Sequence, residues 1–175
     1  MDFYFAVDNQ KTQQEFEMAR VHVSIDSDTQ VLKFDVDLES LPPCIYDGYE
    51  VIANFHVESF DNNQTFYTDS NGLEMQKRIL NYRPTWDINA NYNESFENIT
   101  ANYYPINSAI SMEDGDRVFT VMNGRSQGGS ALSPGNIEFM QNRRIPADDG
   151  RGMGEYLDEK DSLGNGIRVP ATYYV

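Results

Sequence analysis

The sequence predicts an all-β protein, an antiparallel β-sandwich, and three observations support this. Short stretches in which apolar and polar residues alternate recur along the chain, as in strands with one buried face. Six Asn-Gly or Asp-Gly dipeptides supply the positive φ that tight hairpin turns need. Aromatic residues make up 13% of the chain, and they suit pleated surfaces better than helices. No alternation of strands with helical patterns is found, so a parallel α/β fold is not expected.

The first part of the chain holds four candidate strands. Residues 3–7 alternate and predict a short strand, whereas the polar segment 11–20 fits either a helical turn or an exposed edge strand. Residues 21–25 and 32–38 alternate on either side of an Asp-Ser-Asp turn, so they predict an antiparallel hairpin. Residues 51–57 alternate again, which places His56 on the polar face of that strand.

The later strands are shorter and are separated by turn residues. Trp86 is expected to anchor the core, and the alternative is that the aromatic segment 82–86 forms a sugar-stacking platform. Residues 87–101 are polar and rich in Asn, and they predict a long surface loop. Further strands are expected at residues 66–68, 75–79, 102–110, 118–122 and 137–140.

We therefore assign residues 1–157 to one β-sandwich domain. Residues 158–175 are expected to form a loop or C-terminal tail, because most of this segment is polar and rich in Gly. Within it, residues 170–175 have the composition to add an edge strand if a partner is present.

The net charge of −15 narrows the classes of partner. It argues against binding to nucleic acid or anionic membranes, because both need clustered Lys and Arg. It is compatible with a neutral sugar ligand, with an acidic compartment, or with simple solubility. No run approaches the roughly 20 apolar residues of a membrane span, so no membrane insertion is expected.

The sequence features that bear on the cellular compartment point in different directions. The first ten residues lack the basic end and apolar core of a signal peptide. Three glycosylation sequons begin at Asn63, Asn93 and Asn98, but such triplets also arise by chance in a chain rich in Asn.

The titratable residues do not form a catalytic or metal-binding pattern. His22 and His56 lack the spacing of a zinc motif, and a zinc site needs three or four converging ligands. Asp148 and Asp149 are adjacent, so they cannot flank a sugar as the two carboxyl groups of a glycosidase do. These carboxylates are expected to accept N–H groups of their turn or to pair with Arg143, Arg144 or Arg151. No catalytic residue, cofactor or metal ligand is therefore predicted in this chain.

Six ordered motifs carry a family resemblance, and they cover residues 66–155 most strongly. They are FYTDSNG (66–72), YRPTW (82–86), NYYPIN (102–107), SQGGSAL (126–132), RR (143–144) and DDGRG (148–152). In this order they resemble the C-terminal β-domain of the class II α-mannosidases, glycoside hydrolase family 38, and are closest to its lysosomal-type acidic members.

The resemblance implies a galactose-mutarotase-like or super-sandwich β-domain without catalytic machinery. In the family, zinc and the nucleophilic Asp of a retaining reaction lie on an N-terminal α/β barrel, which this chain does not match. The β-domain contacts that barrel and lends a loop to the rim of its active site. Carried over by motif, Arg151 would bind substrate and Asp149 would hold its guanidinium in place. The alternative is a purely structural salt-bridged turn.

The resemblance thus predicts a non-catalytic domain of an enzyme that hydrolyses terminal α-mannosidic bonds of N-glycans. The implied partners are the zinc-dependent barrel and a mannose-containing glycan, in a lysosome or the secretory pathway. This chain alone is expected to be inactive and to be a piece of a larger precursor, a truncated sequence or a separately encoded fragment. The rival hypotheses are a stand-alone carbohydrate-binding module and a structural interaction subunit.

Overall fold

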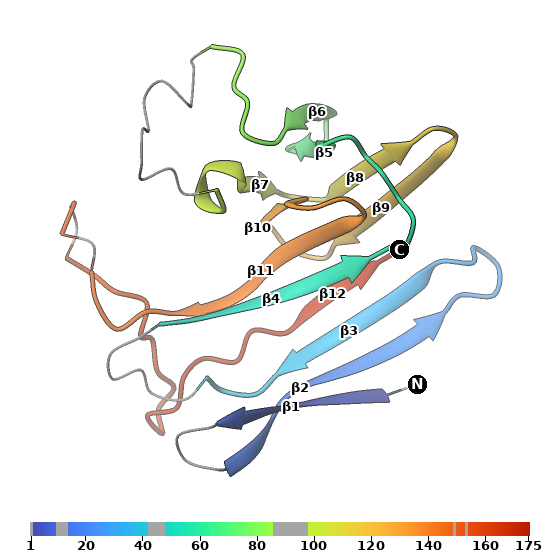
Figure 1. The fold of residues 1–175 in the computed structure, drawn as a ribbon. Coiled ribbons are helices and arrows are strands. Elements are labelled where there is room, and N and C mark those ends of the chain that lie inside the picture. Colours follow the sequence, from blue (N-terminus) through green and yellow to red (C-terminus); the bar gives the residue numbers. More distant parts are fainter. Residues whose placement is uncertain (1, 10–13, 42–47, 86–97, 149, 153) are drawn as a thin grey trace. The chain divides into compact units, whose positions relative to one another are not determined.

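The computed structural model describes residues 2–9, 14–41, 48–85, 98–148, 150–152 and 154–175. It confirms the predicted fold class, because its regular structure consists of antiparallel β-sheets of a β-sandwich and one short 3₁₀ turn, η1 (Thr100–Asn102). The chain divides into two compact units, residues 1–52 with 141–174, and residues 53–140 with 175. Both boundaries fall inside strands, β4 (Tyr49–His56) and β11 (Asn136–Arg144), which continue from one unit into the other (Figure 1).

Unit 1 contains four antiparallel strands in the order β1-β2-β3-β12. Their bounds are Asp2–Asn9, Gln14–Ile25, Leu32–Leu38 and Ala171–Tyr174. The predicted hairpin is confirmed, with Ile25 opposite Leu32, and the Asp26 carboxylate accepts the N–H groups of Asp28 and Thr29 at 2.9 and 2.8 Å. Since β2 begins at Gln14, most of the ambiguous polar segment 11–20 is strand and not helix.

The C-terminal segment differs from the expected tail. Residues 171–174 form β12, which pairs with β3 inside the same chain without any partner. The Tyr173 side chain is completely buried, and its hydroxyl donates to the Gln141 side-chain oxygen at 3.4 Å. Residues 171–174 are therefore strand and not loop or tail, and the strand that residues 170–175 were expected to add with a partner pairs within the chain. Alternation over so short a segment gives only a weak signal.

Unit 2 contains two antiparallel sheets. One has the order β9-β8-β5-β6 and the other the order β11-β10-β7. Their new members are β5 (Thr65–Ser70), β6 (Glu74–Ile79), β7 (Tyr104–Ile106), β8 (Ala109–Asp114), β9 (Arg117–Asn123) and β10 (Gln127–Ser130). The predicted hairpins close at turns with Gly72 at φ +71° and Gly115 at φ +59°. The completely buried apolar side chains of its strands come from both sheets: Phe66, Ile106, Ile110, Met112, Val121, Ile137 and Phe139.

The single strand expected at residues 102–110 is two strands, β7 and β8, in different sheets. The chain breaks at Asn107 and Ser108 because the Asp69 carboxylate takes their N–H groups at 2.8 and 2.9 Å, and that of Ala109 at 3.2 Å. These N–H groups are then not available to one continuous ladder. A carboxylate 38 residues away along the chain thus moves the chain from one sheet to the other.

The Gly-rich segment between the last two apolar runs of unit 2 forms the short strand β10. A side chain at Gly129 would clash with Ile106 and would lie 2.6 Å from the Glu138 carbonyl oxygen. These glycines allow two backbones to approach closely, since β10 pairs with β11 through Gly129 opposite Phe139.

Two predictions about the fold fall on residues outside the described ranges. They are Trp86 as a core anchor or sugar platform, and the loop at residues 87–101 up to residue 97. Among the described residues, no helix has the length and apolar character needed to cross a membrane.

Candidate functional site

The DDGRG motif lies in a loop that leaves the C-terminal end of β11 in unit 1. The loop is closed at its base, because the Ile145 N–H donates to the Leu157 carbonyl at 2.8 Å. Figure 1 shows this excursion, in orange to red, beyond the end of β11. The described residues between 146 and 156 therefore form a loop with a fixed base, which we call the Arg151 loop.

The buried Arg144 side chain anchors that base. Its side chain is 4% exposed, and its Nε donates to Asp158 Oδ1 at 2.6 Å. Its Nη1 donates to the Leu41 carbonyl. Lys160 Nζ binds the other carboxylate oxygen of Asp158 at 2.9 Å. The hydrogen bond from Lys160 has the largest effect on the pKa of Asp158 and the one from Arg144 the next largest, and both lower it.

Gly166 completes the anchor. A side chain at this position would lie 2.7 Å from the Leu41 carbonyl and 2.9 Å from Arg144 Nη1. Only glycine leaves room there, so the segment after the loop is shaped to enclose the arginine.

The tip of the Arg151 loop has the opposite character. Arg151 is exposed, and side chains at Gly150, Gly152 or Gly154 would meet no atom of the described residues within 4 Å. Gly150 has φ +73°, and its N–H donates to Asp148 Oδ2 at 2.9 Å, which confirms the expected turn contact of that carboxylate.

Arg143 and Arg144, which were also expected to pair with Asp148 or Asp149, bind other carboxylates. Arg143 binds Glu50 at 2.7 Å, and Arg144 binds Asp158, so neither pairs with Asp148. Asp149 lies outside the described residues. The structure therefore brings Arg151 and Asp148 into one loop, and it leaves the predicted contact between Asp149 and Arg151 as a prediction.

Unit 2 has a second candidate site, a shallow groove of 510 Å³ beside β7 and β10. Tyr103 packs against Gly128, and its hydroxyl donates to Glu138 at 2.5 Å. The Arg78 and Arg83 guanidinium carbons lie 4.3 and 4.8 Å from the Tyr104 ring centroid. Both tyrosines are therefore already engaged by neighbours. The groove is lined by Tyr103, Tyr104, Pro105, Asn107, Ser126, Gln127 and Gly128.

Sequence reasoning missed two buried charges that shape the units. Asp69 was named only within the FYTDSNG motif, and Arg144 only within the RR motif and as a possible partner of Asp148 or Asp149. Burial opposes the charged form of Asp69, but the N–H groups of Ser108, Ala109, Gly72 and Asn107 outweigh it and lower its pKa from 3.8 to about 2. The available signal was the position of each at the end of an apolar strand, where a charge needs a partner.

The histidines and the described sequon asparagines lie on the surface. His56 is exposed, as expected for the polar face of β4, and its Nδ1 lies 3.1 Å from Asn136 Oδ1. Asn63 and Asn98 are exposed, and Asn93 lies outside the described residues.

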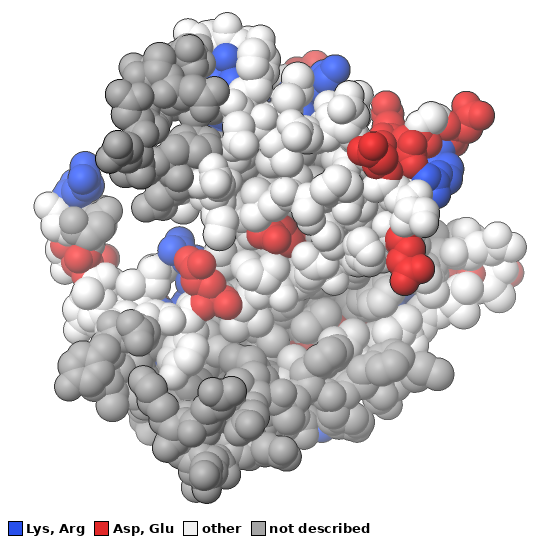
Figure 2. Space-filling model, viewed as in Figure 1, with Lys and Arg blue, Asp and Glu red and all other residues white. Residues whose placement is uncertain are grey.

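The described residues contain no group of three or more His, Cys, Asp or Glu side chains arranged to hold a metal ion. On the face in Figure 2, the described Lys and Arg side chains lie in small separate groups, most of them next to Asp or Glu. This face thus has no continuous basic surface among its described residues of the kind that a phosphate backbone requires.

The sequence matches the family described as "Glycosyl hydrolases family 38 C-terminal domain" over residues 6–151. It is 46% identical over 121 residues to the lysosomal alpha-mannosidase of Felis catus, covering 69% of this chain and 11% of that protein. It is 45% identical over 115 residues to the lysosomal alpha-mannosidase of Homo sapiens, covering 66% of this chain and 11% of that protein. It is 37% identical over 133 residues to the alpha-mannosidase of Canavalia ensiformis, covering 73% of this chain and 13% of that protein. The matches thus span about a tenth of these relatives.

Proposed function

The chain belongs to the glycosyl hydrolases family 38 C-terminal domains, and on this premise we propose that it is a non-catalytic domain of an α-mannosidase. Its work would be to contact the zinc-dependent catalytic barrel and to present Arg151 at the rim of the active site. The complete enzyme would hydrolyse terminal α-mannosidic bonds of N-glycans with retention, in the lysosome or secretory pathway. The chain alone would be inactive.

One observation carries this proposal, namely that the Arg151 loop is fixed at its base and open at its tip. Arg144 and Gly166 fix the base, whereas the glycines beside Arg151 have no described neighbour that requires them. Gly150 is required by its positive φ, but Gly152 has neither a positive φ nor a described atom within 4 Å of the position its side chain would take. The open tip therefore favours a role toward a group outside this chain.

A guanidinium suits that role because it presents a planar fork of donors. Arg151 would donate hydrogen bonds to sugar hydroxyls or to a carboxylate of the zinc pocket. Asp149, one residue before Gly150, would accept from the same guanidinium and hold its orientation. Zinc itself would be held by the barrel, and the described residues of this chain offer no ligand set for it.

The experiment is Arg151→Ala in the full-length enzyme, with an α-mannoside as substrate. We expect kcat/KM to fall about 100-fold, the range seen when one preorganised donor is removed. The thermal midpoint should not change, because Arg151 is exposed. Arg143→Ala is the matched control, since this neighbouring arginine pairs with Glu50 on the surface, and it should keep full activity. Unchanged turnover of Arg151→Ala would refute the assigned role.

The role of Asp149 is tested separately. Asp149→Asn keeps the size of the side chain and removes its charge, so kcat/KM should fall less than for Arg151→Ala. In the double variant, the two effects should not add, because both changes act through one guanidinium. Additive losses would show that the two residues act independently.

The second candidate function is carbohydrate binding without catalysis, and the groove beside β7 and β10 favours it. Its tyrosines and side-chain amides are the groups with which proteins contact sugars, although neighbours already engage both rings. Calorimetric titration with a mannose-containing glycan tests it. Binding that is lost in Ser126→Tyr and retained in Arg151→Ala would favour this function over the first.

A further inference from the structure

A tight turn before β5 contains the sequon Asn63-Gln64-Thr65. The Thr65 N–H donates to the Asn62 carbonyl at 2.8 Å, and Asn63 and Gln64 have φ of +46° and +56°. Positive φ at both central positions is the mark of a type I′ turn. Asn tolerates this conformation, so backbone geometry alone gives one reason for its presence there.

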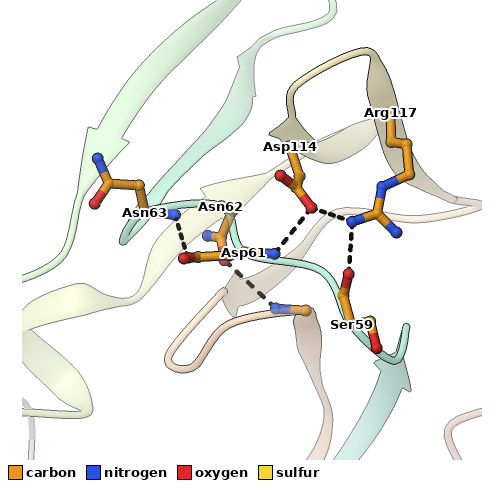
Figure 3. Close-up of polar contacts among 7 residues, drawn as sticks. Ser59, Asp61, Asn62, Asn63, Asp114 and Arg117 are labelled. Atoms are coloured by element: carbon orange, nitrogen blue, oxygen red, sulfur yellow. Dashed lines mark hydrogen bonds and ion pairs between the residues drawn. The ribbon is translucent and has the colours of Figure 1, made fainter.

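The turn is held in place by charged and polar groups of unit 2, shown in Figure 3. The Asn63 N–H donates to Asp61 Oδ1 at 2.9 Å, and the Asp61 N–H donates to Asp114 Oδ2 at 3.1 Å. Arg117 binds the same Asp114 carboxylate, and its Nη2 donates to the Ser59 carbonyl at 2.5 Å. The turn is therefore tied to the β8–β9 hairpin.

Two adjacent asparagines in this turn have opposite roles. Asn62 is 3% exposed; its amide nitrogen donates to the Thr65 carbonyl at 2.7 Å, and its amide oxygen accepts the Gly135 N–H at 3.4 Å. The Asn63 side chain is exposed, makes no hydrogen bond to the described residues, and points away from the network in Figure 3. Only the backbone of Asn63 serves the turn, so its amide is available for chemistry.

The sequon's hydroxyl lies beside the same asparagine. Thr65 Oγ1 donates to the Asn63 carbonyl at 3.2 Å, so both groups that define an acceptor triplet lie on one turn. The geometry assigns Asn63 as an N-glycan attachment site, an inference that rests on the proposed secretory location. The Asn63 side-chain nitrogen bonds to C1 of a lipid diphosphate-linked oligosaccharide. It loses one proton, and the lipid diphosphate leaves with the electrons of the C1–O bond.

A glycan at Asn63 also constrains the arrangement of the complete protein. An N-glycan is bulky and hydrated, so the turn that carries it faces solvent. The part of unit 2 formed by this turn and the β8–β9 hairpin is then not the surface that contacts the catalytic barrel.

The test uses the full-length protein, expressed through the secretory pathway with an added leader so that exposure to the transferase is assured. Enzymatic release of an N-glycan converts its Asn to Asp, and peptide mass spectrometry reads this conversion at Asn63. We expect occupancy in the unchanged protein and in Thr65→Ser, and none in Thr65→Val. Asn63→Gly should abolish the glycan and keep the thermal midpoint, because Gly tolerates the positive φ of the turn.

The outcomes separate this inference from the proposed location. An unmodified Asn63 in the leader-directed protein overturns the inference, whatever the native location is. Occupancy there supports the inference, and the protein without the added leader then reports the native route. If Asn63 is occupied only with the added leader, the site is sound and the proposed secretory location fails.

Discussion

Two glycine motifs of this chain look alike in sequence but differ in structure. In SQGGS, Gly129 lies so close to Ile106 and to the Glu138 carbonyl that any side chain would clash. In DDGRG, Gly150 and Gly152 have no described neighbour within 4 Å of the position a side chain would take. The first motif is explained by the packing of unit 2. In the second, the positive φ of the turn explains Gly150 but nothing in the described structure explains Gly152, and this difference is the basis for assigning Arg151 an external role.

The largest expected effect is on the packed motif. Gly129→Ala should lower the free energy of unfolding by about 3 kcal/mol, because the added methyl group must displace a backbone carbonyl of β11. Gly152→Ala is the matched change in the open motif. Denaturant unfolding of both variants measures the contrast, and equal losses of stability would remove the distinction between the motifs.

A second prediction concerns Asp69, whose carboxylate joins β5 to the start of β8. Its folded pKa of about 2 lies below 3.8, so the stabilisation is complete above pH 3.8 and is lost as the pH falls through 2. The shift corresponds to about 2 kcal/mol. Asp69→Asn should therefore be less stable than the unchanged protein at neutral pH, and the gap should close toward pH 2. A gap that does not change with pH would contradict the role of the charge.

The base of the Arg151 loop offers a smaller effect. Arg144→Met should lower the free energy of unfolding by about 1 to 2 kcal/mol, since Asp158 loses its buried partner but keeps Lys160. Arg143→Met, which breaks only the surface pair with Glu50, should cost at most about 0.5 kcal/mol. Protease cleavage within residues 146–156 should accelerate only in the Arg144 variant. Equal cleavage of both would show that Arg144 does not anchor the loop.

The smallest effect is expected at the open tip. Gly152→Ala should change the free energy of unfolding by no more than about 0.5 kcal/mol, because nothing in the described structure opposes the methyl group and φ is not positive there. If the catalytic barrel lies close to the tip, this variant should still lower activity. A loss of stability in the isolated chain would show that the tip is packed after all.

The sequence was sufficient for the strands that alternate and for the hairpins that end in Asn-Gly or Asp-Gly. Alternation places one face of β4 toward its core, and Gly115 closes the β8–β9 turn. The sequence was not sufficient to predict strand boundaries that depend on a side chain far away along the chain. Asp69 splits residues 104–114 into β7 and β8, and no local pattern predicts a contact across 38 residues.

The same limit applies to the candidate site. The DDGRG motif indicated Arg151, which is exposed at the tip of its loop, and its role toward a substrate stays a prediction. The anchor at Arg144 was not predicted, because Asp158 and Gly166 lie in a segment whose composition indicates only a polar loop. Pairing between residues of two irregular segments leaves no periodic signal.

The most direct test compares the two motifs in one protein, by measuring kcat/KM and the thermal midpoint of full-length Gly129→Ala and Arg151→Ala. We predict that Gly129→Ala lowers the midpoint while the folded fraction keeps its activity. Arg151→Ala should keep the midpoint and lose about 100-fold in kcat/KM. Full activity of Arg151→Ala, or a fall in its midpoint as large as that of Gly129→Ala, would contradict the account.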